Sequence, residues 1–262
     1  MKLLRTSWFW GAFFMLLPET NSAQQGLNVE GYVGLGHVNT AETLGQNNMV
    51  LGLLTRYTQY GEIDPRGEVG EVLFAFAYGL TNNFDLAILV PYVTIDLGRN
   101  DLDKTSFALK YKLIERGHVS VALLPKIRLP IGGAKNLVRA EQPSTMIEVG
   151  TRIQNGAQKL YVNLGYGRVD YIDRFAYQVK ISKMMKIGVG FTYDFSTPIT
   201  AFAEVTGERL IGQIDDNLYF QLGGIWRIKK HLILKASAGM GLLDKNRAII
   251  DQRAITGFSY CI

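Results

Sequence analysis

Charged side chains that could act on a solute stand inside otherwise apolar segments of this 262-residue sequence. In Phe107-Ala108-Leu109-Lys110-Tyr111-Lys112, for example, both lysines alternate with large apolar residues. The complete set comprises Glu71, Asp85, Lys110, Lys112, Lys126, Arg128, Glu148, Arg152, Lys180, Glu204, Arg227 and Lys235. These side chains can form a charged lining that sets solute selectivity, or an internal ion-pair network that fills the interior. The sequence is compatible with both arrangements.

Residue types suited to catalysis or metal binding form no recognisable motif. The histidines are His37, His118 and His231, and none lies beside a serine in an arrangement that activates a nucleophile. Cys261 is the single cysteine, which excludes an internal disulfide framework and a cysteine-rich zinc site. We therefore expect no enzymatic activity, no cofactor and no metal site.

Alternating segments must position the charged residues. Side chains of a β-strand point to opposite faces in turn, so that residues two apart share a face. Phe84 to Tyr92 has one apolar face, and its other face carries Asp85. Val119 to Pro130 likewise directs Lys126 and Arg128 to one side. Each segment is therefore predicted to be a strand with one apolar face and one small, polar or charged face.

The lengths of these segments favour a membrane β-barrel over a soluble barrel or sandwich, whose strands also alternate. They run for about 9–12 residues, as a tilted strand needs to cross a bilayer, whereas ordinary strands average about 5–6. Aromatic residues lie near their ends, as an interfacial girdle requires. These are Tyr57, Tyr78, Tyr92, Tyr111, Tyr166, Tyr193, Trp226 and Tyr260. We predict an all-β, transmembrane, antiparallel up-and-down β-barrel, because only a closed barrel lets strands satisfy every backbone group in lipid.

The N-terminus has the features of a secretory signal peptide over residues 1–23. Lys2 and Arg5 form a positive region, Trp8 to Leu17 is apolar, and Asn21-Ser22-Ala23 is suited to cleavage. The apolar run is too short for a transmembrane helix, which needs about 20 residues. We therefore expect the chain to be exported.

Connections between the segments indicate how the barrel is oriented. Short polar connections lie at 80–83, 115–117, 155–158 and 227–230, and longer ones at 97–103, 132–144 and 244–251. Bacterial barrels have short periplasmic turns and longer outer loops, so the short set is expected to face the periplasm. The last strand, 253–262, would then return to the periplasm with Cys261 directed inward.

Fourteen segments can be counted as strands, but alternating short and long connections require fewer. Region 171–208 fits two strands better than three, and segment 27–37 does not fit the order of turns. Removing one strand at each place leaves twelve, an even number as expected for single-chain bacterial barrels. The predicted division is a signal peptide at 1–23, an N-terminal segment of unassigned structure at 24–47, and a barrel at 48–262.

Several of these segments resemble one family of outer-membrane proteins. Tyr78-Gly79-Leu80-Thr81-Asn82-Asn83-Phe84-Asp85-Leu86 and Val90-Pro91-Tyr92 are similar to a hairpin of the MetA-pathway of phenol degradation family. Phe107 to Tyr111, Leu129 to Gly132 and Ala203 to Val205 resemble further strands of that family. The resemblance covers roughly 48–262 and implies an outer-membrane barrel that passes small hydrophobic or aromatic compounds.

The expected function follows from the predicted barrel and from this resemblance. We expect a passive diffusion channel for small solutes, hydrophobic or aromatic compounds among them, in the outer membrane of a Gram-negative bacterium. A non-conducting structural or interaction barrel is the alternative. About twelve strands enclose a wider interior than the eight that side chains can just fill, so a narrow channel is expected. The expected partners are outer-membrane lipid, the barrel-assembly machinery and a small solute, and the modest net charge of +5 argues against nucleic acid.

Overall fold

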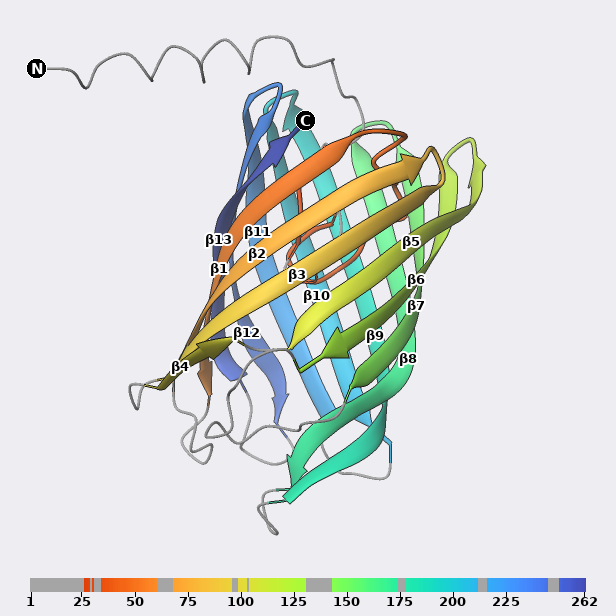
Figure 1. The fold of residues 1–262 in the computed structure, drawn as a ribbon. Coiled ribbons are helices and arrows are strands. Elements are labelled where there is room, and N and C mark those ends of the chain that lie inside the picture. The colour runs from red at the N-terminus through yellow and green to blue at the C-terminus, as the bar shows by residue number, and fades with distance from the viewer. Residues whose placement is uncertain are drawn as a thin grey trace, which may run out of the picture.

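Long strands in which buried and exposed side chains alternate form the whole wall of the protein (Figure 1). The computed structural model describes residues 26–28, 30, 34–60, 68–95, 99–102, 104–130, 143–173, 178–211, 216–244 and 250–262. On β3, Asp85 and Ala87 are buried while Ile88 is exposed, as the alternating sequence predicts. The period of two residues thus gives every long strand an inner and an outer face.

Twelve of the strands close into an antiparallel barrel. They are β1 (Met49–Tyr60), β2 (Glu68–Thr81), β3 (Phe84–Ile95), β5 (Thr105–Arg116), β6 (Val119–Leu129), β7 (Ser144–Asn155), β8 (Gln158–Asp173), β9 (Gln178–Ser196), β10 (Ile199–Leu210), β11 (Asp216–Lys229), β12 (Leu232–Asp244) and β13 (Ile250–Cys261). The short β4 (Arg99–Leu102) pairs with β3 alone. Pairing of β1 with β13 and of β2 with β3 completes the ring. The predicted all-β barrel of twelve strands is confirmed.

The strand count depends on the long β9. Two of the fourteen candidate strands, 174–183 and 186–195, fall in this region; β9 runs without interruption from Gln178 to Ser196 and so joins the described part of the first to the second. The residues between them, Met184 and Met185, are respectively buried and exposed, so the alternation continues through this point. No glycine, proline or asparagine stands at this junction, where residues 183–186 are Lys-Met-Met-Lys. Segment 27–37, by contrast, contributes no strand to the barrel among its described residues.

Short turns lie at one end of the barrel and longer connections at the other. Two-residue turns at 82–83, 117–118, 156–157, 197–198 and 230–231 join strands at the first end. Gly117 and Gly156 adopt positive φ angles of 55° and 57° in two of them, a conformation that glycine adopts without steric cost. The C-terminus lies at the same end, as Figure 1 shows. We call it the short-turn end.

The outer surface carries large apolar side chains around the barrel. Examples are Phe74, Leu164, Met185, Leu222 and Trp226, each of which is more than half exposed. Such a band is what lipid contact requires, because charges on this face would cost about 2–4 kcal/mol each near the bilayer centre. No helix in the described part of the chain has the length and apolar character needed to span a membrane.

Candidate functional site: the lumen and its N-terminal plug

The N-terminal segment fills the middle of the barrel. We call its described residues 26–28, 30 and 34–45 the plug. Its apolar side chains Leu27, Leu35, Val38, Ala41 and Leu44 have no exposed surface. They form one apolar cluster with inward side chains of the wall, including Leu54, Leu73, Leu124, Tyr161 and Ile225. Figure 1 shows this segment, in red and orange, within the ring of strands.

The plug is a loop that enters and leaves through the short-turn end. At its start, the Leu27 amide donates to Ser259 Oγ at 3.1 Å, close to the end of β13. At its end, the Leu44 amide donates to Asp85, the second residue of β3, at 3.0 and 3.1 Å to its two carboxylate oxygens. A bridge between Gly34 and Asn39 folds the chain back inside the barrel. The loop therefore does not thread through the lumen.

Glycines in the wall make room for the plug. A Cβ atom on Gly190 would lie 2.5 Å from Leu35 Cδ1 and 3.4 Å from Val38 Cβ, and one on Gly188 would lie 3.2 Å from Val38 Cγ2. A Cβ on Gly79 would lie only 1.8 Å from the Gly45 carbonyl oxygen. Missing side chains at these positions thus permit close contact between the wall and the plug.

The centre of the lumen holds a buried charge cluster around Glu30 of the plug. Lys126 Nζ donates to Glu30 Oε2 at 2.8 Å, and Lys186 Nζ contacts Glu30 Oε1. Glu148 lies 3.3 Å from Lys186 and 3.8 Å from Lys126. Asn39 Nδ2 donates to Glu30 at 3.1 Å and to Glu148 at 3.0 Å. Two ammonium groups and two carboxylates therefore neutralise one another here.

Glu30 remains charged in this environment. Burial alone would raise the pKa of its carboxyl, but the neighbouring charges of Lys126, Lys186 and Arg128 hold that pKa well below its usual range. An ionised Glu30 can therefore act as the anionic partner of both lysines.

Other charges of the wall bind the backbone of the plug. Glu204 accepts hydrogen bonds from the amides of His37 at 2.8 Å and Val38 at 3.1 Å. Lys235 Nζ donates to the carbonyl oxygens of Leu27 and Leu35, each at 3.0 Å, and to that of Gly34 at 2.5 Å. The three donors of this ammonium group thus match three carbonyl acceptors of the plug.

A second plug carboxylate, Glu42, pairs with the wall nearer the short-turn end. Arg152 Nη1 lies 3.3 Å from Glu42 Oε1, and the Tyr161 hydroxyl lies 3.4 Å from the same oxygen. Lys110 Nζ donates to the Glu42 carbonyl oxygen at 2.9 Å. Both acidic side chains of the plug are therefore held by cations of the wall.

His37 contacts the wall on the side of β13. Arg253 Nη1 lies 2.7 Å from His37 Nε2, and the same guanidinium lies 4.5 Å from the centre of the Tyr219 ring. Burial, and then the positive charges of Arg253 and Arg56, lower the pKa of His37 well below its usual range. The imidazole is therefore neutral and accepts a hydrogen bond through Nε2. His118 and His231 lie in two-residue turns.

Four of the remaining charges from the predicted set lie outside the contacts with the plug. Glu71 pairs with Arg56 of the neighbouring β1. Lys112 donates to Glu115 at 2.6 Å. Arg227 donates to the Thr197 carbonyl oxygen at 2.8 Å and lies 3.9 Å from Asp194, and Arg128 is exposed. The side chain of Lys180 lies outside the described residues.

The partners of these charges differ from the predicted pairing. From the sequence, Lys110, Lys112, Lys126 and Arg128 form a basic stripe on two neighbouring strands, and Glu71, Asp85, Glu148 and Glu204 on other strands could face it across the interior. Glu148 does approach Lys126. Asp85 and Glu204 instead bind amides of the plug, because the plug occupies the space between opposite walls. The N-terminal segment, whose structure the sequence left unassigned, therefore supplies the partners of these wall charges.

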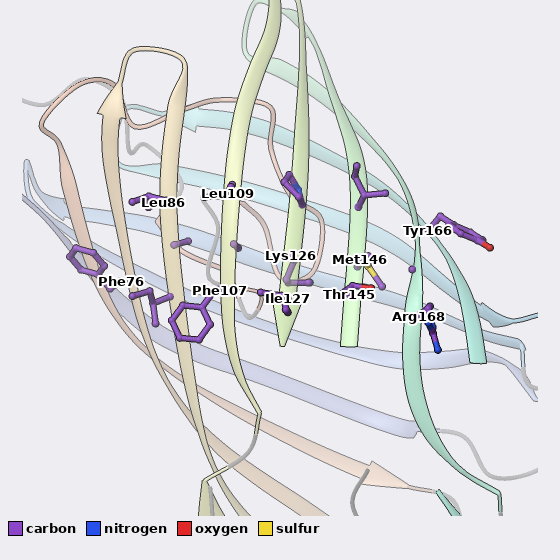
Figure 2. Close-up of a pocket in the computed structure, with 16 residues that line it drawn as sticks. Phe76, Leu86, Phe107, Leu109, Lys126, Ile127, Thr145, Met146, Tyr166 and Arg168 are labelled. Carbon is purple, nitrogen blue, oxygen red and sulfur yellow. The ribbon is translucent and has the colours of Figure 1, made fainter. Parts of the chain in front are cut away.

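An apolar groove of about 760 Å³ follows the wall from β2 to β8 (Figure 2). Its lining includes Ile88, Phe107 and Tyr166, which lie on the outer faces of their strands. Lys126 and Arg168 also border the groove, and most of the other charges described above lie with the plug. No group of three or more metal-ligating side chains occurs in the part of the chain that the structure describes.

Solved structures share this architecture. The fold is that of the outer-membrane porins. The NanC porin aligns with a TM-score of 0.58 at 8% identity, covering 80% of this chain and 98% of its own. An outer membrane channel from Pseudomonas putida F1 aligns with a TM-score of 0.60 at 12% identity, covering 88% and 100%. The KdgM porin aligns with a TM-score of 0.53 at 13% identity, covering 80% and 98%. No family model and no curated protein matches the sequence.

Proposed function

We propose that this protein is a passive diffusion channel for small solutes in the outer membrane of a Gram-negative bacterium. The observation that carries the proposal is the contrast between the two faces of one closed wall. Its outer face carries large apolar side chains, and its inner face carries buried lysines and carboxylates such as Lys126 and Glu148. A polar interior within an apolar exterior is the arrangement of a water-filled path through lipid.

The likeness to solved channels supports the barrel, and the solute is proposed on other grounds. The hairpin from Tyr78 to Tyr92 resembles the MetA-pathway of phenol degradation family, which favours small hydrophobic or aromatic compounds. The twelve predicted charged residues would then line or border the path of the solute.

A non-conducting structural or interaction barrel is the second candidate. One observation favours it: apolar side chains of the plug have no exposed surface inside the barrel, so the lumen is occupied at this depth. The two functions differ in whether the plug leaves the lumen or stays in it.

Planar bilayer recordings of the purified protein test the proposal. A gel shift between boiled and unboiled samples would first show that the barrel is folded. Discrete conductance steps from folded protein are expected of a channel. Folded protein that conducts neither ions nor, in liposome swelling, an uncharged sugar would favour the structural barrel.

A further inference from the structure

The inner face of the wall carries more positive charge than the acidic side chains of the plug neutralise. Six cationic and three anionic wall side chains bind described residues of the plug, a formal excess of three positive charges (6 − 3). They are Lys110, Lys126, Arg152, Lys186, Lys235 and Arg253, against Asp85, Glu148 and Glu204. Glu30 and Glu42 reduce the excess to one (3 − 2). A lumen without the plug would therefore attract anions.

The Glu30 carboxylate shows how one anion is held at the centre of this wall. Lys126, Lys186 and Asn39 all donate to its two oxygens, and both lysines are at least nine-tenths buried. Charge-assisted hydrogen bonds of this kind are stronger than those between neutral groups. Asn39 belongs to the plug, so the wall itself contributes the two ammonium groups.

We propose that Glu30 occupies an anion-binding site of the channel, and that Lys126 and Lys186 bind a small monocarboxylate there when the plug is displaced. This inference rests on the proposed channel function. The charge of the site favours a monoanion, since Glu148 offsets one of the two lysines and leaves a single positive charge to be balanced. Arg128, exposed at the end of β6 away from the short turns, adds a positive charge that attracts anions toward the site.

The geometry permits the plug to leave. Both of its ends lie at the short-turn end, so the loop can withdraw there without drawing a chain terminus through the barrel. The hydrogen bonds described above between the plug and the wall strands each involve a side chain of the wall. No strand pairing joins residues 34–45 to the sheet. The wall ladder from β1 to β13 therefore remains intact when the plug is displaced.

A reversible tether can hold the plug in place. Val38 Cβ lies 3.4 Å from the position of a Cβ atom on Gly190, close to the separation of about 3.5–4.5 Å found in disulfides. The variant is Val38→Cys with Gly190→Cys in a Cys261→Ala background, so that the native buried thiol cannot interfere. Formation of the disulfide in folded barrels is itself expected. Folded barrels that remain reduced under oxidant would contradict the docked plug and overturn the inference.

The recordings use the barrel with its plug present, in planar bilayers with a gradient of potassium acetate. Adding a reductant to the tethered variant should raise the conductance about tenfold, with a reversal potential that shows acetate to be more permeant than potassium. Equal conductance before and after reduction would show that the plug need not move, which overturns the inference.

Lysine variants without the tether separate the anion site from the channel. Lys126→Gln with Lys186→Gln should lower the acetate-to-potassium permeability ratio by about tenfold, because two charges are lost from the path even if water screens them. Lys229→Gln removes one charge at the exposed end of β11 and should leave the ratio unchanged. A conducting barrel that prefers potassium, or a ratio that the double variant does not change, would refute the anion site while leaving the channel in place. Absence of conductance from folded protein in every state would refute both.

Discussion

Removing the charge of Glu30, while keeping the shape of this side chain, should release the plug. Glu30→Gln keeps the length of the side chain and deprives Lys126 and Lys186 of their shared carboxylate. Loss of one partner from a buried ion pair costs about 3–5 kcal/mol. Glu148 remains 3.3 and 3.8 Å from the two lysines and retains part of the attraction. We therefore expect Glu30→Gln to weaken docking of the plug by about 3 kcal/mol. This shifts the equilibrium between docked and displaced plug by a factor of about 150 toward the displaced state.

Thiol labelling measures this equilibrium. Val38 has no exposed surface, so Val38→Cys in a Cys261→Ala background can react with a maleimide only when the plug is displaced. When docking is fast relative to labelling, the rate follows the displaced fraction. Glu30→Gln should therefore increase the rate about 100-fold, toward the limit set by fully displaced protein.

A matched control removes a carboxylate that is equally close to a lysine but exposed. Glu115 accepts from Lys112 at 2.6 Å, and its side chain is 49% exposed. Exposed pairs contribute about 0–1 kcal/mol, so Glu115→Gln should change the labelling rate by less than about fivefold. Equal rates for Glu30→Gln and the parent protein would refute the argument that this carboxylate holds the plug.

Two further perturbations act on the same docked state. Gly79→Val should raise the labelling rate, because its Cβ would lie 1.8 Å from the backbone carbonyl oxygen of Gly45 in the plug. Gly70→Val on the same strand should not, since the nearest atom there lies 4.0 Å away; similar rates in both variants would contradict the close contact. Lowering the pH from about 7.5 to about 5.5 should also loosen the plug. His37 in the displaced plug takes up a proton near pH 6.5, whereas burial lowers the pKa of the docked imidazole and keeps it neutral. Docking is therefore favoured above that pH and weakens below it. With rates corrected for the pH dependence of a free thiol, His37→Asn should remove the effect, and a variant that kept the full pH dependence would exclude this histidine.

The wall of the barrel could be predicted from the order of residues along the chain. Alternation with a period of two residues is a local signal, and a bilayer forces every strand to keep its apolar face outward. The face assigned to Asp85, Lys110 and Lys126 could therefore be read from adjacent residues, and the order of short and long connections set the strand count outside two ambiguous regions, 27–37 and 171–208. In region 171–208 the order of turns favoured two strands over three, and no glycine, proline or asparagine lies at Lys183–Lys186, where two candidate strands join into β9.

The tertiary structure alone decided what lies inside the wall. Segment 27–37 of the plug could be counted as a strand and was set aside only because it did not fit the order of turns, so nothing in the sequence placed Leu27, Leu35 and Leu44 inside the barrel. Its partners are distant along the chain: Lys126 is 96 residues from Glu30, and Asn163 is 124 residues from Asn39. Such pairs become neighbours only after the barrel closes, because closure creates a lumen too wide for wall side chains to fill and brings opposite strands around one inserted loop.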